Sequence, residues 1–482
     1  MQLNIVDNAR KVVSKNTAKE HKSEFGQYLT PASVARFMAS LFVVNDSDVF
    51  LLDPGAGLGA LACAFIDRFG NANLDVTAYE LDSVLIPELH KHLTSYTHIT
   101  SHVLEADFIT YVSKHIDSAQ NQYTHAILNP PYKKISSISE HRKSLRSVGI
   151  ETVNMYSAFV ALTIAQMKQF GQVVAIIPRS FCNGPYYKPF REFILSRSAI
   201  THIHLFDSRD KAFRDDDVLQ ENIIIKFEVG KQQSNVIIST SLDDSFEDFS
   251  ANEFISNHII DPNDPDKFIH IPVDKEQEQP LPSILRYSLN DINISVSTGP
   301  VVDFRLKDHL KIEIDDLSVP LLYPGHFNNG GLCWPNSANK PSAILYNSDT
   351  SKWLYPNNGF YCVVKRFTSK EERRRIVANV VDTSMLPTSF IGFENHLNVF
   401  HFKKNGIHRH LAYGIAAYLN TSLIDNHFRR FSGHTQVNVT DLKKMPYPDH
   451  DFLIKFGIWF EKCAEKTQEQ IDKKLEELLN EQ

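Results

Sequence analysis

The sequence predicts a doubly wound α/β domain with a mostly parallel sheet, followed by a second region of mixed α/β structure. Short, strongly apolar runs alternate with segments of helical character over the first 240 residues, a pattern typical of strands covered on both faces. A glycine-rich turn at residues 54–59 directly follows the first of these runs. Beyond residue 290 the pattern changes to short strands separated by Pro, Gly and Asn turns, which indicates a different architecture.

Length and composition limit the classes of protein to which the chain can belong. Its 482 residues suffice for two or three domains, and contents of 42% hydrophobic and 22% charged residues are typical of a soluble globular protein. No apolar run reaches the roughly 18 residues of a membrane span. The N-terminus lacks the basic and then apolar pattern of a secretory signal. We therefore expect a cytoplasmic protein that does not enter a membrane.

The five cysteines are scattered along the chain and include no C-x-x-C pair. This distribution argues against a disulfide framework and against a zinc site, and it fits a reducing compartment. We predict no bound metal.

The first helix relevant to the site is expected at residues 32–42, directly after Thr30 and Pro31. Thr30 can cap this helix with Pro31 at its first position, which is a common helix start. The free N–H groups of the first turn would suit a carboxylate. Capping alone would also explain the two residues.

A ligand-binding turn is expected after the strand at residues 49–53, which ends in Asp53. Gly55, Gly57 and Gly59 allow a tight turn and a close approach of the backbone to a ligand. The next strand ends at Glu80, and an acid about 20 residues beyond such a turn is placed to bind ribose hydroxyls. The spacing is G-x-G-x-G and not G-x-G-x-x-G, which disfavours a nicotinamide cofactor.

The third α/β unit contains a strand at residues 100–104 that leads into Asp107 and Phe108. A carboxylate followed by an aromatic residue at a strand end could bond an amino group and pack against its ring. This pair carries little information alone, and its value comes from its place between the glycine turn and the next strand.

The fourth strand, at residues 123–128, ends at Asn129. Pro130 and Pro131 forbid both a helix and ladder pairing here, so the Asn129 amide and the Pro130 carbonyl are held stiffly at the strand's carboxyl end. Ligands of open α/β sheets bind at that edge. A planar group bearing an NH₂ could stack on Tyr132 and donate both N–H bonds to the two oxygens. The alternative is an ordinary strand-to-loop turn.

Asn-Pro-Pro-Tyr and the ordered segments before it resemble the gamma class of N6-adenine DNA methyltransferases. The resemblance implies a class I fold that binds S-adenosylmethionine (SAM) through Thr30, Pro31, Asp53, Gly55, Gly57, Glu80, Asp107 and Phe108. It also implies that Asn129, Pro130, Pro131 and Tyr132 are catalytic. Asn129 and Pro130 would accept the amino protons of an adenine flipped out of the duplex, and Tyr132 would stack on that base.

A second aromatic wall for the flipped base is expected between the strands at residues 200–206 and 222–229. In the resembled family this loop carries a phenylalanine, which makes Phe213 our candidate. The alternatives are Phe181 or neither residue, and the sequence does not decide among them.

The second half of the chain is expected to read the DNA sequence. Residues 392–400 and 432–438 resemble parts of the C-terminal specificity region of BsuBI/PstI-type methylases from restriction–modification systems. Residues 361–444 carry 13 Lys/Arg against 6 Asp/Glu, whereas residues 241–280 carry 11 Asp/Glu against 2 Lys, so the net charge of −7 conceals a basic region. We expect phosphate contacts from Arg366, Arg373, Arg374, Arg375, Arg429 and Arg430.

These observations predict four parts: a catalytic domain at 1–240, an acidic connecting segment at 241–289, a target-recognition domain at 290–450 and an amphipathic helix at 451–482. The expected function is site-specific methylation of adenine N6 in double-stranded DNA by a monomer, with any partner restriction endonuclease on a separate chain. Alternatives are a methyltransferase of protein glutamine or RNA, and a non-catalytic DNA-binding defence module. A nicotinamide-dependent oxidoreductase is the alternative that the glycine spacing disfavours.

Overall fold

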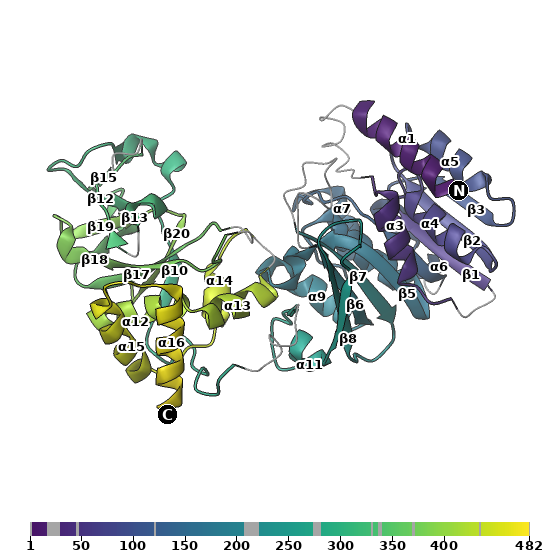
Figure 1. Ribbon diagram of the computed structural model, residues 1–482. Helices are drawn as coiled ribbons and strands as arrows, with labels where there is room; N and C mark the ends of the chain where they lie inside the picture. The colour runs from purple at the N-terminus through teal and green to yellow at the C-terminus, as the bar shows by residue number, and fades with distance from the viewer. Residues whose placement is uncertain are drawn as a thin grey trace. The chain divides into compact units, whose positions relative to one another are not determined.

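The computed structural model describes residues 2–16, 29–44, 48–119, 122–206, 221–272, 281–328, 331–335, 340–368, 372–432 and 435–481. The chain forms two compact units, Met1–Glu278 and Gln279–Gln482 (Figure 1). None of the helices within the described ranges is long and apolar enough to span a membrane.

A nine-stranded sheet in the order β3-β2-β1-β4-β5-β7-β6-β8-β9 forms the centre of the first unit. The strands from β3 to β5 run parallel, β7 is antiparallel to β5 and β6, β8 is parallel to β6, and β9 is antiparallel to β8. Their bounds are β1 Asp48–Pro54, β2 Asn73–Glu80, β3 Thr100–Glu105, β4 Tyr123–Leu128, β5 Met167–Pro178, β6 Ser198–Phe206, β7 Asn222–Val229, β8 Val236–Ser241 and β9 Ser250–Phe254. The predicted doubly wound, mostly parallel sheet is therefore confirmed.

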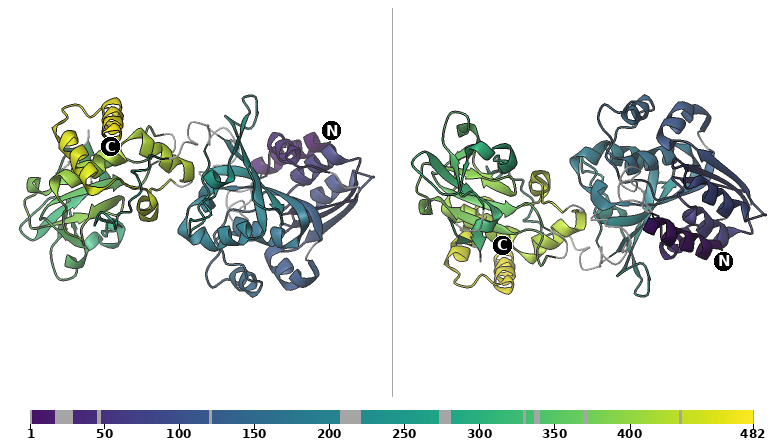
Figure 2. Two further views of the ribbon diagram at one scale, coloured as in Figure 1. Left: turned by 90° about the horizontal axis from the view of Figure 1, so that it is seen from below. Right: turned by 90° about the horizontal axis from the view of Figure 1, so that it is seen from above.

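Helices cover both faces of this sheet (Figure 2). One group of helices consists of α1 Gln2–Asn16, α3 Ala32–Ser40, α4 Ala60–Phe69 and α5 Ile86–Thr94. A second group consists of α6 Phe108–Ala119, α7 Glu140–Ser147, α8 Met155–Gln166 and α9 Lys188–Leu195. Ile127 and Val174 of the sheet share an apolar core with the first group, whereas Leu128 and Ala175 share one with the second. Alternate residues of β4 and β5 thus face opposite layers, as the period of a strand requires.

The predicted connecting segment at 241–289 is wrong in its first part. β9 pairs with β8 inside the sheet, and Phe254 and Ile259 are buried in the core of the first unit. Asp248 accepts the backbone N–H of Leu242, so this carboxylate closes a turn. An acidic composition therefore concealed a packed segment, which also includes the short helix α11 Ser256–Ile259.

The second unit has mixed α/β structure, with one sheet in the order β10-β20-β17-β18, another in the order β11-β15-β12-β19-β16, and the pair β13-β14. Its strands are β10 Ser295–Thr298, β11 Leu310–Lys311, β12 Ser318–Leu322, β13 Phe327–Asn328, β14 Gly331–Leu332, β15 Ala343–Leu345, β16 Leu354–Pro356, β17 Phe360–Lys365, β18 Ala378–Asp382, β19 Phe390–Phe393 and β20 Leu397–His401. Its helices are α12 Arg409–Leu419, α13 Ser422–Phe431, α14 Val439–Lys444, α15 His450–Lys462 and α16 Gln468–Asn480.

The single C-terminal helix predicted at 451–482 is wrong, because two helices occupy this stretch. The side chain of Thr467 caps α16 by accepting the N–H of Gln470. α12 and α15 pack backbone to backbone, since a Cβ added at Gly414 would lie 1.9 Å from the carbonyl oxygen of Leu453. The helical pattern of the sequence was correct, but the cap at Thr467 divides it.

Candidate active site

The carboxyl ends of β1 and β4 meet at one edge of the first unit's sheet. Leu51 pairs with His125 and Leu52 with Ala126, and the strand order reverses between these two strands. Such a reversal creates the crevice in which open α/β sheets bind ligands. The crevice here has about 340 Å³ of empty space, including space open to solvent, and is lined by Val6, Arg10, Leu29, Thr30, Gly55, Ala56, Gly57, Leu58, Ala60, Leu61 and Asn129.

Asn129 is held by two hydroxyl groups. Its Nδ2 donates to Thr30 Oγ1 at 3.0 Å, and the Tyr132 hydroxyl lies 3.0 Å from its Oδ1. The same hydroxyl lies 3.2 Å from the carbonyl oxygen of Ile176 in β5. Pro130 is buried and Pro131 is half-buried, so the chain after the strand is fixed as well. The structure thus brings together Thr30 and the Asn-Pro-Pro-Tyr motif, which are far apart in sequence.

Thr30 does not cap α3, contrary to our expectation. The helix begins at Ala32 with Pro31 as its N-cap and with no side-chain cap. The Ala32 N–H donates instead to Asp7 Oδ1 of α1, at 3.2 Å. The hydroxyl of Thr30 is therefore available to Asn129, and the Asp7 carboxylate accepts the first N–H of the helix.

Glu80 ties the end of β2 to the glycine turn. Its Oε2 accepts the N–H of Gly57 at 2.7 Å, and its Oε1 accepts the N–H groups of Leu81 and Asp82. Burial raises the pKa of Glu80 against the opposing effect of these three bonds. Gly57 has φ +56°, and a Cβ there would lie 3.0 Å from Leu29 Cδ2, so the turn requires glycine at this position.

Asp53 ends β1 as a fully buried carboxyl group. Its Oδ2 accepts the N–H of Ala62 at 3.1 Å, while its Oδ1 has no hydrogen-bond partner among the residues that the structure describes. Burial raises the pKa of Asp53 to about 8. The side chain is thus mostly protonated at neutral pH and can serve as a donor next to the glycine turn.

Asp107 directly precedes α6, and its side chain joins the first turn of this helix to His141 of α7. Its Oδ1 accepts the N–H of Thr110 at 2.7 Å, and His141 Nε2 lies 2.9 Å from its Oδ2. Burial works to raise the pKa of Asp107, but the bonds from His141 and Thr110 outweigh burial and lower it. The bond to Asp107 raises the pKa of His141. Neither Asp107 nor its neighbour Phe108 lines the crevice described above.

Of the three phenylalanines predicted for the cofactor and base pockets, two are buried in the apolar core and the third lies outside the described residues. Phe108 is buried, with its ring centroid 5.1 Å from that of Tyr79 and 4.9 Å from that of Phe159. Phe181 is fully buried against Phe190, which is a core position. Phe213 lies outside the described residues, so its assignment stays a prediction.

Sequence reasoning missed α1 and His141. α1 carries Val6 and Arg10 to the crevice, and it packs Leu3 and Val6 into the core beside α3 and α4. The helical spacing of Leu3, Val6 and Val13 was a signal for this helix. His141 had no comparable signal, because only the fold brings it to Asp107.

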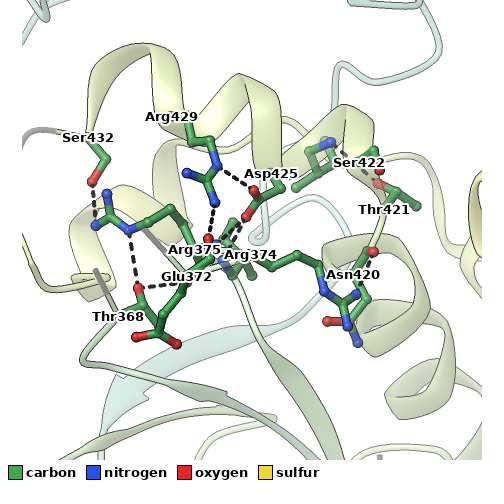
Figure 3. A network of polar contacts seen from close by, with 12 residues as sticks. Thr368, Glu372, Arg374, Arg375, Asn420, Thr421, Ser422, Asp425, Arg429 and Ser432 are labelled. Carbon is green, nitrogen blue, oxygen red and sulfur yellow. Dashed lines mark hydrogen bonds and ion pairs between the residues drawn. The ribbon is translucent and has the colours of Figure 1, made fainter. Parts of the chain in front are cut away.

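In the second unit, at least four of the six arginines expected to contact phosphate instead bond to the protein itself: Arg366, which is described below, and three that Figure 3 shows. Arg375 is buried and donates through its side chain to Thr368 and Ser432. Arg429 bonds to Asp425 at 2.7 Å and to the Glu372 carbonyl. Arg374 donates to the Asn420 carbonyl, whereas Arg373 is exposed.

The two segments that resemble a specificity region lie next to each other. The Arg366 N–H donates to the His396 carbonyl, and the Val437 N–H donates to the Arg366 carbonyl. The Arg366 side chain bonds to Gln436 at 3.2 Å, and the exposed Phe367 ring lies 4.8 Å from that of His396. Residues 433–434 lie outside the described part of the chain.

No group of three or more His, Cys, Asp or Glu side chains among the described residues is arranged to hold a metal ion.

Comparison with known proteins matches this chain to one family model and to two methyltransferases over nearly their full length. Residues 60–213 match the family model of the Eco57I restriction-modification methylase. The chain is 48% identical to the Type II methyltransferase M.BsuBI of Bacillus subtilis, over 99% of this chain and 98% of that protein. It is 39% identical to the Type II methyltransferase M.PstI of Providencia stuartii, over 94% and 93% of the two chains.

Two solved structures share the fold. One is a DrdV–DNA complex, with a TM-score of 0.56 and 12% identity over 95% of this chain and 59% of that one. The other is the Type ISP restriction-modification enzyme LlaGI with a DNA substrate mimic, with a TM-score of 0.52 and 10% identity over 94% of this chain and 56% of that one.

Proposed function

Because the chain belongs to the family of Type II restriction–modification methyltransferases, we propose that it transfers a methyl group from SAM to the N6 amino group of adenine in double-stranded DNA. The observation that carries this proposal is the position of Asn129, which Thr30 and Tyr132 hold beside the glycine-turn crevice. The two near-full-length relatives are both named Type II methyltransferases, which supports DNA as the substrate.

The residues around the crevice fit SAM. Leu29, Leu58 and Leu61 give it apolar walls, and Glu80 offers carboxylate oxygens near the turn for the ribose hydroxyls. A Cβ at Gly57 would lie 3.0 Å from Leu29 Cδ2, so the turn carries no side chain there, and Gly55 and Gly57 line the crevice with backbone atoms. Asp107 at the end of β3 would bind the adenine amino group of SAM, as the sequence suggested. When bound, SAM supplies a methyl group on a positively charged sulfur atom.

The chain's own residues would hold the substrate amine. An adenine within a duplex must be flipped out, which takes a few kcal/mol, and stacking on an aromatic ring such as Tyr132 returns about 1–3 kcal/mol. Asn129 Oδ1 and the Pro130 carbonyl would accept the two amino protons, because both are fixed at the strand end. These acceptors stabilise the positive charge that develops on the nitrogen as it attacks, so they act chiefly in the transition state.

We propose that the second unit recognises the target sequence. The segments at 361–368 and 392–400, together with residues 435–438, form a surface with arginine, glutamine and an exposed aromatic ring, which are side chains able to contact bases and phosphates. We further propose that the protein acts as a monomer and that any partner restriction endonuclease is a separate chain. Phe213 remains our candidate for the second wall of the base pocket.

The decisive experiment measures the modified base directly. Purified protein is incubated with tritium-labelled SAM and plasmid DNA, and the DNA is then digested to nucleosides for mass spectrometry. We expect N6-methyladenine from the wild type and none from Asn129→Ala, which loses an acceptor for the amine. Asn129→Ala should keep its affinity for S-adenosylhomocysteine within about threefold, since the glycine turn and the other residues that line the crevice are unchanged.

Other products would overturn the proposal. Methylated cytosine would refute the adenine assignment, and label in RNA or protein would favour one of those methyltransferase classes. DNA binding without transfer by the wild type would indicate a non-catalytic module. Wild-type turnover by Asn129→Ala would refute the role of Asn129.

A further inference from the structure

The carboxyl edge of the first unit's sheet continues beyond Asn129 to the start of β7. β5 lies between β4 and β7, and Asn222, the first residue of β7, pairs with Pro178, the last residue of β5. The backbone N–H of Arg179 donates to the Glu221 carbonyl at 2.7 Å, and the buried side chains of these two residues form an ion pair at 3.0 Å. These bonds join the end of β5 to the start of β7, so the backbone that carries Asn222 is held in place.

Asn222 lies on the same face of the sheet as Asn129. Successive side chains of a strand point to opposite faces. In β7, Ile224 belongs to the apolar core that contains α3, and Lys226 Nζ donates to the carbonyl of the residue that follows α3. Asn222 precedes these two residues at even spacing and therefore shares their face. Asn129 bonds to Thr30, directly before the same helix, so the two asparagine amides lie at one edge and on one face.

The side-chain amide of Asn222 is buried without a partner. The residue is 5% exposed, and neither its Nδ2 nor its Oδ1 has a hydrogen-bond partner within the part of the chain that the structure describes. Burying an amide without a hydrogen bond is costly, so such a group in a native fold calls for a functional reason. The amide of Asn129, on the same face, is bonded at both ends. The unpaired donor and acceptor of Asn222 therefore point to a ligand at this edge.

The separation of the strands fits a base between the two asparagines. Neighbouring strands lie about 4.8 Å apart, so β4 and β7 are separated by roughly 10 Å. A hydrogen bond takes up about 3 Å at each end, and the remaining space corresponds to one planar base. Pro130 is buried as Asn222 is, so both sides of the proposed base site are closed to solvent.

The chemistry of the base decides which atom of the amide it would meet. Once Asn129 and the Pro130 carbonyl have accepted both amino protons, the hydrogen-bonding atoms left on adenine are its ring nitrogens, which are acceptors. The Nδ2 group of Asn222 supplies the matching donor.

We propose that Asn222 Nδ2 donates a hydrogen bond to a ring nitrogen of the flipped adenine. This inference rests on the proposed methylation of adenine, and it adds a residue that selects the base across the site from the acceptors of its amine. A base that lacks this nitrogen should be a poorer substrate, because the buried donor would then stay unpaired.

The test changes the protein and the DNA together. Duplexes carry the methylated adenine, located by modified-base sequencing, or 1-deaza-, 3-deaza- or 7-deazaadenine in its place. We expect one analogue to lower kcat/KM of the wild type about 5–20-fold more than that of Asn222→Leu, because only the wild type loses a hydrogen bond. The other two analogues should affect both proteins equally. Any change in the reactivity of the amine cancels, since both proteins meet the same base.

The variant also separates a contact with the base from a role in the fold. On unmodified DNA, Asn222→Leu should lower kcat/KM about 5–20-fold. Its melting temperature should not fall, because leucine has nearly the shape of asparagine and removes the unpaired buried amide. Affinity for S-adenosylhomocysteine should stay within about twofold, since Asn222 is not among the described residues that line the glycine-turn crevice.

Ile224→Val is the matched control. It changes packing two residues further along the same face of β7 but removes no polar group. We expect its kcat/KM to stay within about twofold of the wild type, and its response to the three analogues to be the same as that of the wild type.

Three results would overturn the role of Asn222. They are equal losses in the wild type and Asn222→Leu with every analogue, an unchanged kcat/KM of Asn222→Leu on unmodified DNA, or a lowered melting temperature together with weaker binding of S-adenosylhomocysteine. If the wild type methylates adenine while any of these holds, the proposed function stands without Asn222. A wild type that does not methylate adenine would overturn the proposed function together with this inference.

Discussion

At the scale of single residues, two hydroxyl groups hold the two ends of the Asn129 amide. Thr30 Oγ1 accepts from Nδ2 at 3.0 Å, and the Tyr132 hydroxyl donates to Oδ1 at 3.0 Å. An acceptor that is already oriented loses no free energy to reorientation when the substrate amine arrives.

Thr30→Val tests this orientation. The substitution keeps the shape of the side chain but removes the acceptor for Asn129 Nδ2, and a hydrogen bond of this kind is worth about 1 kcal/mol. We expect the methyl-transfer rate constant at saturating SAM and DNA to fall about fivefold, measured in single-turnover reactions. Thr30→Ser retains the hydroxyl and should stay near the wild-type rate. Equal losses in the two variants would mean that the hydroxyl is not responsible.

The sequence allowed several site residues to be predicted because local chemistry fixes their positions. Two prolines end β4 at Asn129, and three glycines shape the turn after β1, whatever the rest of the fold does. Arg10 and His141 were not predictable in this way. Their positions at the site depend on which elements become neighbours in space, and no local pattern encodes that.

At the scale of elements, the buried Asp53 near the end of β1 makes the free energy of unfolding depend on pH. Asp53 has a pKa of about 8 in the folded protein, raised by burial, against about 3.9 when exposed. Between these two values the folded state retains a proton that the unfolded state has released. The contribution of Asp53 to stability therefore falls as pH rises through this window and levels off above about pH 8.

Asp53→Asn should remove this dependence, because an amide does not ionise. We expect the difference in melting temperature between the variant and the wild type to shift in favour of the variant from pH 5 to pH 9. Thermal unfolding of the apoprotein across this range measures it, and all other groups cancel in the comparison. A difference that does not change with pH would contradict a buried, protonated Asp53.

Elements were predicted well where a strong apolar period coincided with clear ends. β4 and β7 have the expected bounds, since each is a continuous apolar run next to a turn. β9 was missed because Ser250–Phe254 alternates weakly and lies within an acidic stretch. The C-terminal helices were merged because the Lys- and Glu-rich stretch after Cys463 contains no Pro or Gly to mark the break before Thr467.

At the scale of the whole molecule, the second unit depends on buried polar bonds at Asp425. This side chain accepts the N–H groups of Arg375 and Ile376 at 2.7 and 2.8 Å, and it pairs with Arg429 (Figure 3). These bonds tie α13 to the chain that enters β18. The arginines here are therefore part of the fold, and a count of basic residues overstated the charge available to DNA.

Asp425→Ala should destabilise the second unit selectively. Removing one partner of a buried ion pair costs about 3–5 kcal/mol, and for a unit of this size each kcal/mol lowers the melting temperature by about 2–4 °C. We expect calorimetry to show a transition lowered by roughly 6–20 °C, with affinity for S-adenosylhomocysteine unchanged because the crevice belongs to the first unit. Arg373→Ala, at an exposed neighbouring position, is the control and should stay within about 1 °C. Loss of S-adenosylhomocysteine binding in Asp425→Ala would contradict this separation.

The division of the chain was predicted in outline, with two units of different architecture. The first unit extends to Glu278 and not to residue 240, because β8, β9 and the buried residues after them complete its core. The acidic composition of residues 241–280 predicted an exposed segment, but it could not show that carboxylates such as that of Asp248 are used to close turns.

The position of α1 has a practical consequence for anyone who expresses or edits the gene. Chain termini usually tolerate tags, trimming and fusion partners, but here the first residues form part of a wall. The next methionine in the sequence is Met38. Translation started there would lose α1, Thr30 and Pro31 in one step while leaving the Asn-Pro-Pro-Tyr motif in place.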